Sequence, residues 1–160
     1  MTTDLDDTDR ALLRALIDDG SLSAKAAGEA VGLSQPAAWR RIKRLQDLGI
    51  LTGRHAVLDA EKLGFGVTVF LGVKLRTKGR TSLADFERAV IAIPEVQVVQ
   101  HVLGVYDYRL KVVARDLADF ERILRRRIMT LPGVGEIESN VLLSQEPLTA
   151  AALLGGAPRV

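Results

Sequence analysis

The chain has 160 residues, 48% hydrophobic and 26% charged, which is room for one ordinary domain or two small ones. This composition excludes a wholly disordered chain, and no apolar run approaches the roughly 18 residues of a membrane span. The acidic N-terminus lacks the apolar core of a signal peptide. The absence of cysteine excludes disulfides and thiol chemistry, and two histidines argue against a metal site within one chain. We therefore expect a cytoplasmic protein with no cofactor and no metal.

Charge is unevenly distributed along the chain. The formal net charge is only +2, yet residues 35–54 carry five Lys or Arg against one Asp. A basic patch within a near-neutral region indicates a surface for a polyanion, whereas the alternative is a solvated helix face.

The first fifty residues have helical periodicity. One helix is predicted between Asp6, which can cap its start, and Gly20, which can end it. A second is predicted from its cap Ser23 to Val31, before Gly32. The apolar stripe of the first helix consists of Leu12, Leu13, Leu16 and Ile17.

A third helix is predicted from Ser34 to Gly49, with Pro36 in its first turn, where a missing N–H costs little. Its inward face is predicted to be Ala38, Ile42 and Leu45. Its basic side is predicted to be Arg40, Lys43 and Arg44, with Arg41 at the flank. Three short helices with a tight turn before a basic third helix indicate a helix-turn-helix that inserts into the major groove, rather than a bundle without a nucleic-acid role.

From Val67 the apolar period changes from 3.6 to 2, and a strand is predicted over residues 67–75. An internal repeat follows, because residues 82–90 and 116–124 align with an offset of 34. Each copy is predicted to be a helix, capped by Ser82 or Asp116. Further strands are predicted over residues 96–103, 106–114 and 134–143. The resulting β-α-β-β-α-β order predicts a ferredoxin-like, α+β domain with both helices on one face of the sheet.

The strand over residues 106–114 has one apolar face and one mixed face. The apolar face contains Leu110, Val112 and Ala114, and the mixed face contains Arg109, Lys111 and Val113. Val99 and Leu103 are expected to add apolar surface to the mixed face, in register with His101, so we expect that face to form an interface. We expect His101 to be packed or to lie in that interface rather than to bind a ligand.

These patterns divide the chain into a helix-turn-helix domain (1–51), a linker (52–66), the ferredoxin-like domain (67–145) and a tail (146–160). The linker is predicted to contain a strand at residues 52–58 and a turn at 59–64. The tail is predicted to contain a short apolar helix at 147–154.

Five strings in this order resemble the Lrp/AsnC family of leucine-responsive, or feast/famine, transcription regulators. They are LDDTDRALLRAL, VGLSQPAAWRRIKRLQDLGIL, LDAEKLGF, GVYDY and LPGV, and they span roughly residues 5–145. The resemblance implies a winged or simple helix-turn-helix, a C-terminal effector-binding (RAM) domain, homodimers built through the sheets, higher assemblies such as octamers, and small amino-acid effectors.

The resemblance also implies the DNA-binding residues. Ser34 would begin the recognition helix, and the candidates nearest base edges are Gln35, Pro36, Trp39 and Arg40. Phosphate or stabilising contacts would come from Arg41, Lys43 and Arg44. Trp39 is expected to pack rather than to contact DNA, because family members usually carry an aliphatic residue there. Ala27 and Gly28 depart from the family pattern, which suggests a looser second helix.

The effector residues implied by the resemblance are Gly104, Tyr106, Asp107 and Ser139. A turn glycine lets backbone N–H groups approach a carboxylate, Asp107 can face an ammonium, and a hydroxyl such as that of Ser139 can serve either. Leu103 replaces the frequent Thr before Gly104. The alternative is ordinary Gly-x-x-Asp turn chemistry.

Two other functions are alternatives to a DNA-binding regulator. Siroheme decarboxylases resemble the same two-domain family, and His101, Arg109 and Lys111 are the residues that would support such an enzyme. An effector-binding protein that has lost DNA binding is the third possibility. Arg125, Arg126 and Arg127 are expected to be a solvated helix end rather than a contact to wrapped DNA. The intact basic helix favours a regulator without enzymatic activity.

Overall fold

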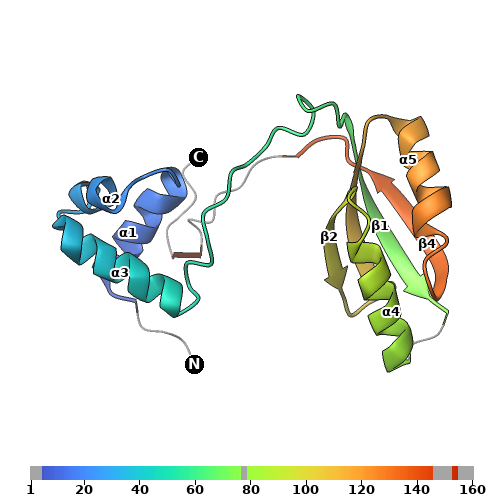
Figure 1. Ribbon diagram of the computed structural model, residues 1–160, viewed down its shortest axis with the longest axis horizontal. Helices are drawn as coiled ribbons and strands as arrows, with labels where there is room; N and C mark the ends of the chain where they lie inside the picture. Colours follow the sequence, from blue (N-terminus) through green and yellow to red (C-terminus); the bar gives the residue numbers. More distant parts are fainter. Residues whose placement is uncertain (1–4, 77–78, 146–152, 155–160) are drawn as a thin grey trace. The chain divides into compact units, whose positions relative to one another are not determined.

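The computed structural model describes residues 5–76, 79–145 and 153–154. The chain divides into two compact units (Figure 1), the first comprising Met1–Val57 with Glu146–Val160 and the second comprising Leu58–Gln145. None of the described helices combines the length and apolar character needed to span a bilayer.

The described residues of the first unit form three α-helices, in the order expected. They are α1 (Asp7–Asp18), α2 (Ala24–Ala30) and α3 (Gln35–Asp47). Asp6 caps α1 by accepting a hydrogen bond from the backbone N–H of Asp9, and Ser23 caps α2 through the N–H of Ala26. Gly32 and Gly49 follow α2 and α3 in the left-handed conformation that glycine adopts most easily.

The core of this unit joins all three helices. Two clusters of buried residues form it, one of Leu12, Leu16, Ala27 and Ile42, the other of Leu13, Leu45 and Leu154. Gly28 is buried where α2 meets α3, and a Cβ atom at this position would lie 2.9 Å from the Cβ of Ala38. The expectation of a looser second helix is therefore wrong at this position, because the missing side chain permits close helix packing.

The second unit has the expected β-α-β-β-α-β order. Its elements are β1 (Val67–Leu75), α4 (Arg80–Ile91), β2 (Val96–His101), β3 (Tyr108–Ala114), α5 (Leu117–Ile123) with a π-helical turn η1 (Leu124–Ile128), and β4 (Val134–Val141). The antiparallel sheet has the strand order β2-β3-β1-β4 (Figure 1). This arrangement confirms the α+β fold class.

The core of the second unit lies between the sheet and its helices. Alternate residues of β1 and β3 meet Phe86 and Val90 of α4 and Phe120 and Ile123 of α5 in one buried cluster. The buried strand residues are Val69, Leu71, Val73, Leu75, Tyr108, Leu110, Val112 and Ala114. The period-2 pattern therefore assigned the two faces of β1 and β3 correctly.

Several boundaries differ from the sequence prediction, since β2 and β4 end two residues earlier and β3 begins two residues later than expected. Helix α4 begins at Arg80 after Gly79, so Ser82 lies inside the helix and is not its cap. Residues 52–58 form no strand, and the predicted turn at residues 59–64 is present, closed by a hydrogen bond from the Phe65 N–H to the Ala60 carbonyl. Of the helix expected over residues 147–154, residues 147–152 lie outside the described chain, and Leu153 and Leu154 are in a 3-10 conformation.

Val99 lies on the helix-facing side of the sheet and not, as expected, on the mixed face. Val99 pairs with Leu110 in the β2–β3 ladder and packs against the core below the helices, so it does not belong to the mixed face. The register shifts between Val96 and Val98, and such an irregularity changes which residues share a face. Val98 takes the open face instead, opposite Lys111, and Leu103 lies beyond the end of β2.

Candidate DNA interface and ligand pocket

The exposed surface of α3 begins at its first turn. Ser34 precedes the helix without making a side-chain capping hydrogen bond, and Gln35 and Pro36 are exposed. Trp39 is 58% exposed, which contradicts the expectation that it packs. Because the inward face follows the spacing of Ala38, Ile42 and Leu45, Trp39 is rotated about 100° from it.

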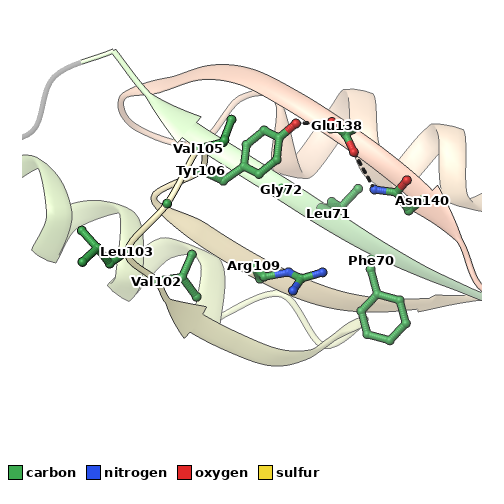
Figure 2. A pocket seen from close by; sticks show the side chains of 11 residues that line it. Phe70, Leu71, Gly72, Val102, Leu103, Val105, Tyr106, Arg109, Glu138 and Asn140 are labelled. Atoms are coloured by element: carbon green, nitrogen blue, oxygen red, sulfur yellow. Dashed lines mark hydrogen bonds between the residues drawn. The ribbon is translucent and has the colours of Figure 1, made fainter.

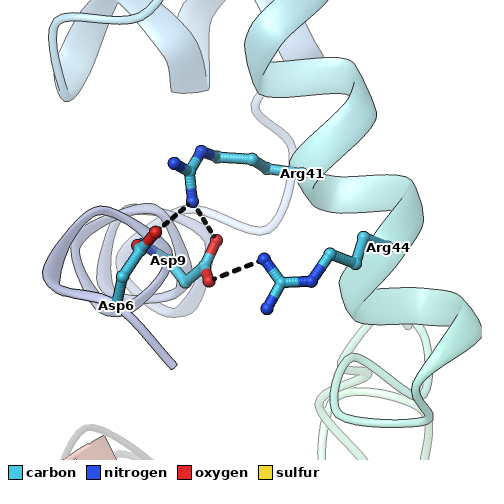
Figure 3. Close-up of polar contacts among 4 residues, drawn as sticks. All are labelled: Asp6, Asp9, Arg41 and Arg44. Atoms are coloured by element: carbon cyan, nitrogen blue, oxygen red, sulfur yellow. Dashed lines mark hydrogen bonds and ion pairs between the residues drawn. The ribbon is translucent and has the colours of Figure 1, made fainter. Parts of the chain in front are cut away.

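Arg41 and Arg44 do not extend freely into solvent. Arg41 Nη1 donates to Asp6 Oδ2 and Asp9 Oδ1 at 2.7 Å each, and Arg44 Nη1 donates to Asp9 Oδ2 at 3.2 Å (Figure 3). The Asp9 side chain is fully buried. The hydrogen bond from Arg41 holds the pKa of Asp6 below its usual value. This Asp9 cluster (Asp6, Asp9, Arg41 and Arg44) therefore ties α1 to α3 by charge-assisted hydrogen bonds.

Two basic side chains of α3 remain outside the Asp9 cluster. Lys43 pairs with Asp47 at 2.8 Å along the helix surface, an exposed i,i+4 pair that contributes little to stability. Arg40 is exposed and has no ion pair within the described chain. Arg40 is therefore the cation of α3 with the greatest freedom to approach another molecule.

The open face of the sheet contains a pocket of about 490 Å³ next to the β2–β3 loop (Figure 2). Of the four expected effector residues, Gly104 and Tyr106 line it. The other lining residues are Phe70, Leu71, Gly72, Val102, Leu103, Val105, Arg109, Glu138 and Asn140. The pocket thus combines an apolar rim with one cation and one carboxylate.

Gly72 explains why this pocket exists. A Cβ atom on Gly72 would lie 2.6 Å from Cδ2 of Tyr106, so the absent side chain lets the Tyr106 ring lie against β1. Both Arg109 on β3 and Glu138 on β4 pair across from Gly72. Since neighbouring strands are about 4.8 Å apart, these two opposite charges flank the glycine on the same face.

Glu138 is held in its charged form. The hydroxyl of Tyr106 donates to Glu138 Oε2, and Asn140 Nδ2 donates to Glu138 Oε1 at 2.9 Å (Figure 2). These hydrogen bonds, that from Tyr106 first, lower the pKa of Glu138, and the same contact raises the pKa of Tyr106. The pocket therefore presents a fixed negative charge.

Asp107 and Ser139 do not line this pocket. Asp107 Oδ2 accepts a hydrogen bond from the Leu75 N–H at 2.9 Å, and the backbone N–H of Asp107 donates to the Val73 carbonyl. Asp107 thus fixes the loop to the end of β1. Ser139 pairs with Leu71 and so lies on the helix-facing side of β4, opposite to Glu138.

The remaining candidates have structural contacts. His101 stacks on Tyr108 with ring centroids 4.8 Å apart, although its side chain is exposed. Because it pairs with the buried Tyr108, it lies on the helix-facing side of the sheet and not, as expected, on the mixed face. Arg125 pairs with Glu121 at 3.0 Å and Arg127 pairs with Glu95, as expected of a solvated helix end. The described residues include no group of three or more His, Cys, Asp or Glu side chains that could hold a metal ion.

Sequence reasoning missed several residues of these sites. Asp9 is not among the site residues predicted from the sequence, although a carboxylate at the start of α1 and arginines on α3 offered a pairing signal. Gly72 is a glycine in the interior of a predicted strand, a pattern that indicates close approach of another group. Nothing in the sequence linked Glu138 to Tyr106, 32 residues away.

Comparison with known proteins covers both units. Residues 5–46 match the family model of the AsnC-type helix-turn-helix domain, and residues 68–149 match that of the Lrp/AsnC ligand binding domain. The chain is 35% identical over 147 residues to the DNA-binding transcriptional activator DecR of Escherichia coli, covering 92% of this chain and 97% of DecR. It is 36% identical over 148 residues to the Bkd operon transcriptional regulator of Pseudomonas aeruginosa, covering 92% and 97%.

Solved structures agree with these sequence matches. The transcriptional regulator NMB0573 of Neisseria meningitidis, crystallised as an L-Met complex, superposes with a TM-score of 0.85 at 30% identity, covering 92% of this chain and 96% of that one. Escherichia coli AsnC has the same fold, with a TM-score of 0.81 at 21% identity over 91% of this chain and 97% of AsnC. These comparisons support a regulator and give no support to a siroheme decarboxylase.

Proposed function

The chain belongs to the Lrp/AsnC family of DNA-binding transcriptional regulators, and from this premise we propose that α3 reads operator DNA through its exposed surface and that a small amino acid bound beside Tyr106 modulates the response. The side chain of Arg40 on α3, which is exposed and forms no ion pair with any described residue, is the observation that carries the DNA-reading part. The charged pocket around Gly72 supports the effector part. As a regulator, the protein is not an enzyme, and its place of action is the cytoplasm.

On the DNA side, residues of the first turns of α3 are the candidates for base contacts. They are Gln35, Pro36, Trp39 and Arg40, all exposed, with Ser34 at the helix start. Lys43 is the candidate for a phosphate contact, because its exposed partner Asp47 can release it at little cost. Arg41 and Arg44 are assigned the stabilising role, since their guanidinium groups are already bound to carboxylates.

Arg40→Ala is expected to weaken operator binding by about 1–3 kcal/mol, or roughly 5- to 150-fold, without changing thermal stability. Fluorescence anisotropy at several salt concentrations tests this. If Arg40 reads a base, Arg40→Lys stays weak and specificity relaxes at one base pair, because lysine lacks the bidentate fork. If it binds phosphate, Arg40→Lys recovers affinity and Arg40→Ala flattens the salt slope by about one unit.

The matched control for this test is Arg88→Ala, which removes an exposed arginine from α4 of the other unit. Its DNA affinity is expected to equal that of the unmodified chain. Wild-type affinity and salt slope in Arg40→Ala would contradict the proposed interface. Failure of the unmodified chain to bind any genomic fragment would instead indicate a protein that has lost DNA binding.

We infer a homodimer, and a higher assembly such as an octamer, that binds imperfect inverted repeats. The open sheet face supports a dimer, since it exposes apolar Val98 beside Lys111, and Leu103 and Val105 are also exposed. Two recognition helices related by a twofold axis bind half-sites about one helical turn, or a multiple of it, apart. Sedimentation of a stable monomer, or a footprint over one asymmetric half-site, would contradict this arrangement.

The pocket chemistry fits an amino acid with an apolar side chain. The Arg109 guanidinium can receive a carboxylate and ionised Glu138 can receive an ammonium, while Phe70 and Val102 offer apolar contact. Asp107 and Ser139, which the family resemblance implied, take no direct part in this proposal. Asp107 instead supports the loop that carries Gly104 and Tyr106.

Calorimetry with the twenty amino acids, starting with the L-methionine found in the NMB0573 complex, tests the effector proposal. Arg109→Gln and Glu138→Gln are each expected to weaken binding at least tenfold, because each removes one charge-assisted contact. Glu136→Gln is the control, since Glu136 is an exposed carboxylate on the same strand outside the pocket lining. Binding by no amino acid, or unchanged affinity in both pocket variants, would remove this site.

A further inference from the structure

A leucine near the end of the chain is part of the core of the first unit. Leu154 is 9% exposed and clusters with Leu13 of α1 and Leu45 of α3. The guanidinium Nη2 of Arg14, next to Leu13, donates to the Leu154 carbonyl at 3.3 Å. The neighbouring Leu153 is 87% exposed, so one of two adjacent leucines is selected for burial.

Leu154 lies outside both family matches, whereas Leu13 and Leu45 lie within the helix-turn-helix match. The helix-turn-helix model ends at residue 46 and the ligand-binding model ends at residue 149. Contacts within the structure nevertheless group Glu146–Val160 with Met1–Val57. Leu153 and Leu154 are therefore grouped with the helices of the first unit, although the whole second unit separates them from those helices in the sequence.

We propose that the apolar site between Leu13 and Leu45 is a docking site for the C-terminal segment of the same chain, with Leu154 as its anchor. The site is complementary to a leucine because leucine and isoleucine side chains surround it, with Leu5, Ile17, Ile50 and Leu51 packing against the cluster. The hydrogen bond from Arg14 adds a polar contact that fixes the segment's backbone.

Docking at this position holds the recognition helix α3 against α1. Leu45 is fully buried on α3, and Leu13 is on α1, the same two helices that the Asp9 cluster joins. In addition to the Asp9 cluster, the apolar packing of Leu154 therefore connects α1 with α3. Leu154 follows the effector unit in the sequence. The effector unit is consequently attached to the DNA-binding unit through two covalent connections rather than one.

The first test compares two full-length variants. Leu154→Ala is expected to lower the midpoint of thermal unfolding of the DNA-binding unit by about 4 °C or more and to weaken operator binding several-fold. Leu153→Ala, an equal truncation of an exposed side chain, is expected to leave both values unchanged. Equal behaviour of the two variants would overturn the proposal.

The second test observes docking directly and exploits the absence of cysteine from the chain. A nitroxide on Leu153→Cys is expected to broaden the backbone amide signals of α1 and α3 near Arg14 and Leu45, and adding Leu154→Ala is expected to restore them. A second sample mixes spin-labelled chains without ¹⁵N with ¹⁵N-labelled chains without a spin label. It shows whether the segment docks within its own chain or on a second copy. Broadening of the ¹⁵N-labelled chains in the mixed sample would mean that the segment docks on a second copy, which overturns docking within one chain, as would an absence of broadening in both samples.

Discussion

Gly28→Leu is expected to destabilise the DNA-binding unit by about 3 kcal/mol or more, and Gly28→Ala by about 1 kcal/mol. Even a single Cβ atom at this position would lie 2.9 Å from the Ala38 Cβ and 3.0 Å from the Leu33 carbonyl oxygen. Neither neighbour is the flexible end of a long side chain, so α2 and α3 must separate. The roughly 1 kcal/mol gained in helix propensity by Gly→Ala offsets only part of this cost.

Chemical denaturation of each variant measures the loss, and Gly20→Ala is the matched control. Gly20 is exposed, has no positive φ, and a Cβ there would meet only the Leu16 carbonyl at 3.8 Å, an ordinary contact. We expect this control to be neutral or slightly stabilising. A Gly28→Leu variant with unchanged unfolding free energy and operator affinity would show that α2 and α3 do not approach this closely.

Asp9→Ala is the second change with a large expected effect, a loss of about 3 kcal/mol in the free energy of unfolding. The buried carboxylate accepts hydrogen bonds from both Arg41 and Arg44, and its removal leaves both guanidinium groups without that partner. Their side chains are 30% and 47% exposed, so water compensates in part and the loss falls at the lower end of the range for buried pairs.

Asp7→Ala is the control for this prediction, because Asp7 is an exposed acid in the same first turn of α1. It removes an equal charge and an equal helix-dipole contribution of a few tenths of a kcal/mol. Urea unfolding at low and at high salt separates the loss of the buried Asp9 contacts from the loss of an exposed charge, since salt screening weakens exposed charge interactions much more than buried ones. If Asp9→Ala and Asp7→Ala lose equal stability, the Asp9 cluster does not hold α1 and α3 together.

Local patterns were enough to predict most of the fold. The 3.6-residue spacing of Ala38, Ile42 and Leu45 identified the buried face of α3, because a helix places such positions above one another. Asp6 and Asp116 were predicted as caps because a cap is a contact between residues three apart. Both kinds of inference require only the chain within one or two turns.

The unpredicted features depend on contacts between distant segments. The face of Val99 depended on a register shift in β2, and a strand's own sequence does not fix the register of its pairing. The link between Glu138 and Tyr106 exists because β4 pairs with β1 next to the β2–β3 loop. Trp39 was expected to pack because family members usually carry an aliphatic residue there, whereas its position on the helix decided its exposure.

The position of Leu154 also has a consequence for how the protein is made. A ribosome releases the N-terminal residues first, and domains generally fold in that order. Leu45 precedes the leucine that packs against it by 109 residues, and Leu13 precedes it by 141. During synthesis, the apolar site between Leu13 and Leu45 therefore stays uncovered until the second unit and Leu154 have been synthesised. A chain whose translation stops before Leu154 would lack the side chain that packs between α1 and the recognition helix α3. Such truncated products would therefore bind operator sites less well than the full-length regulator.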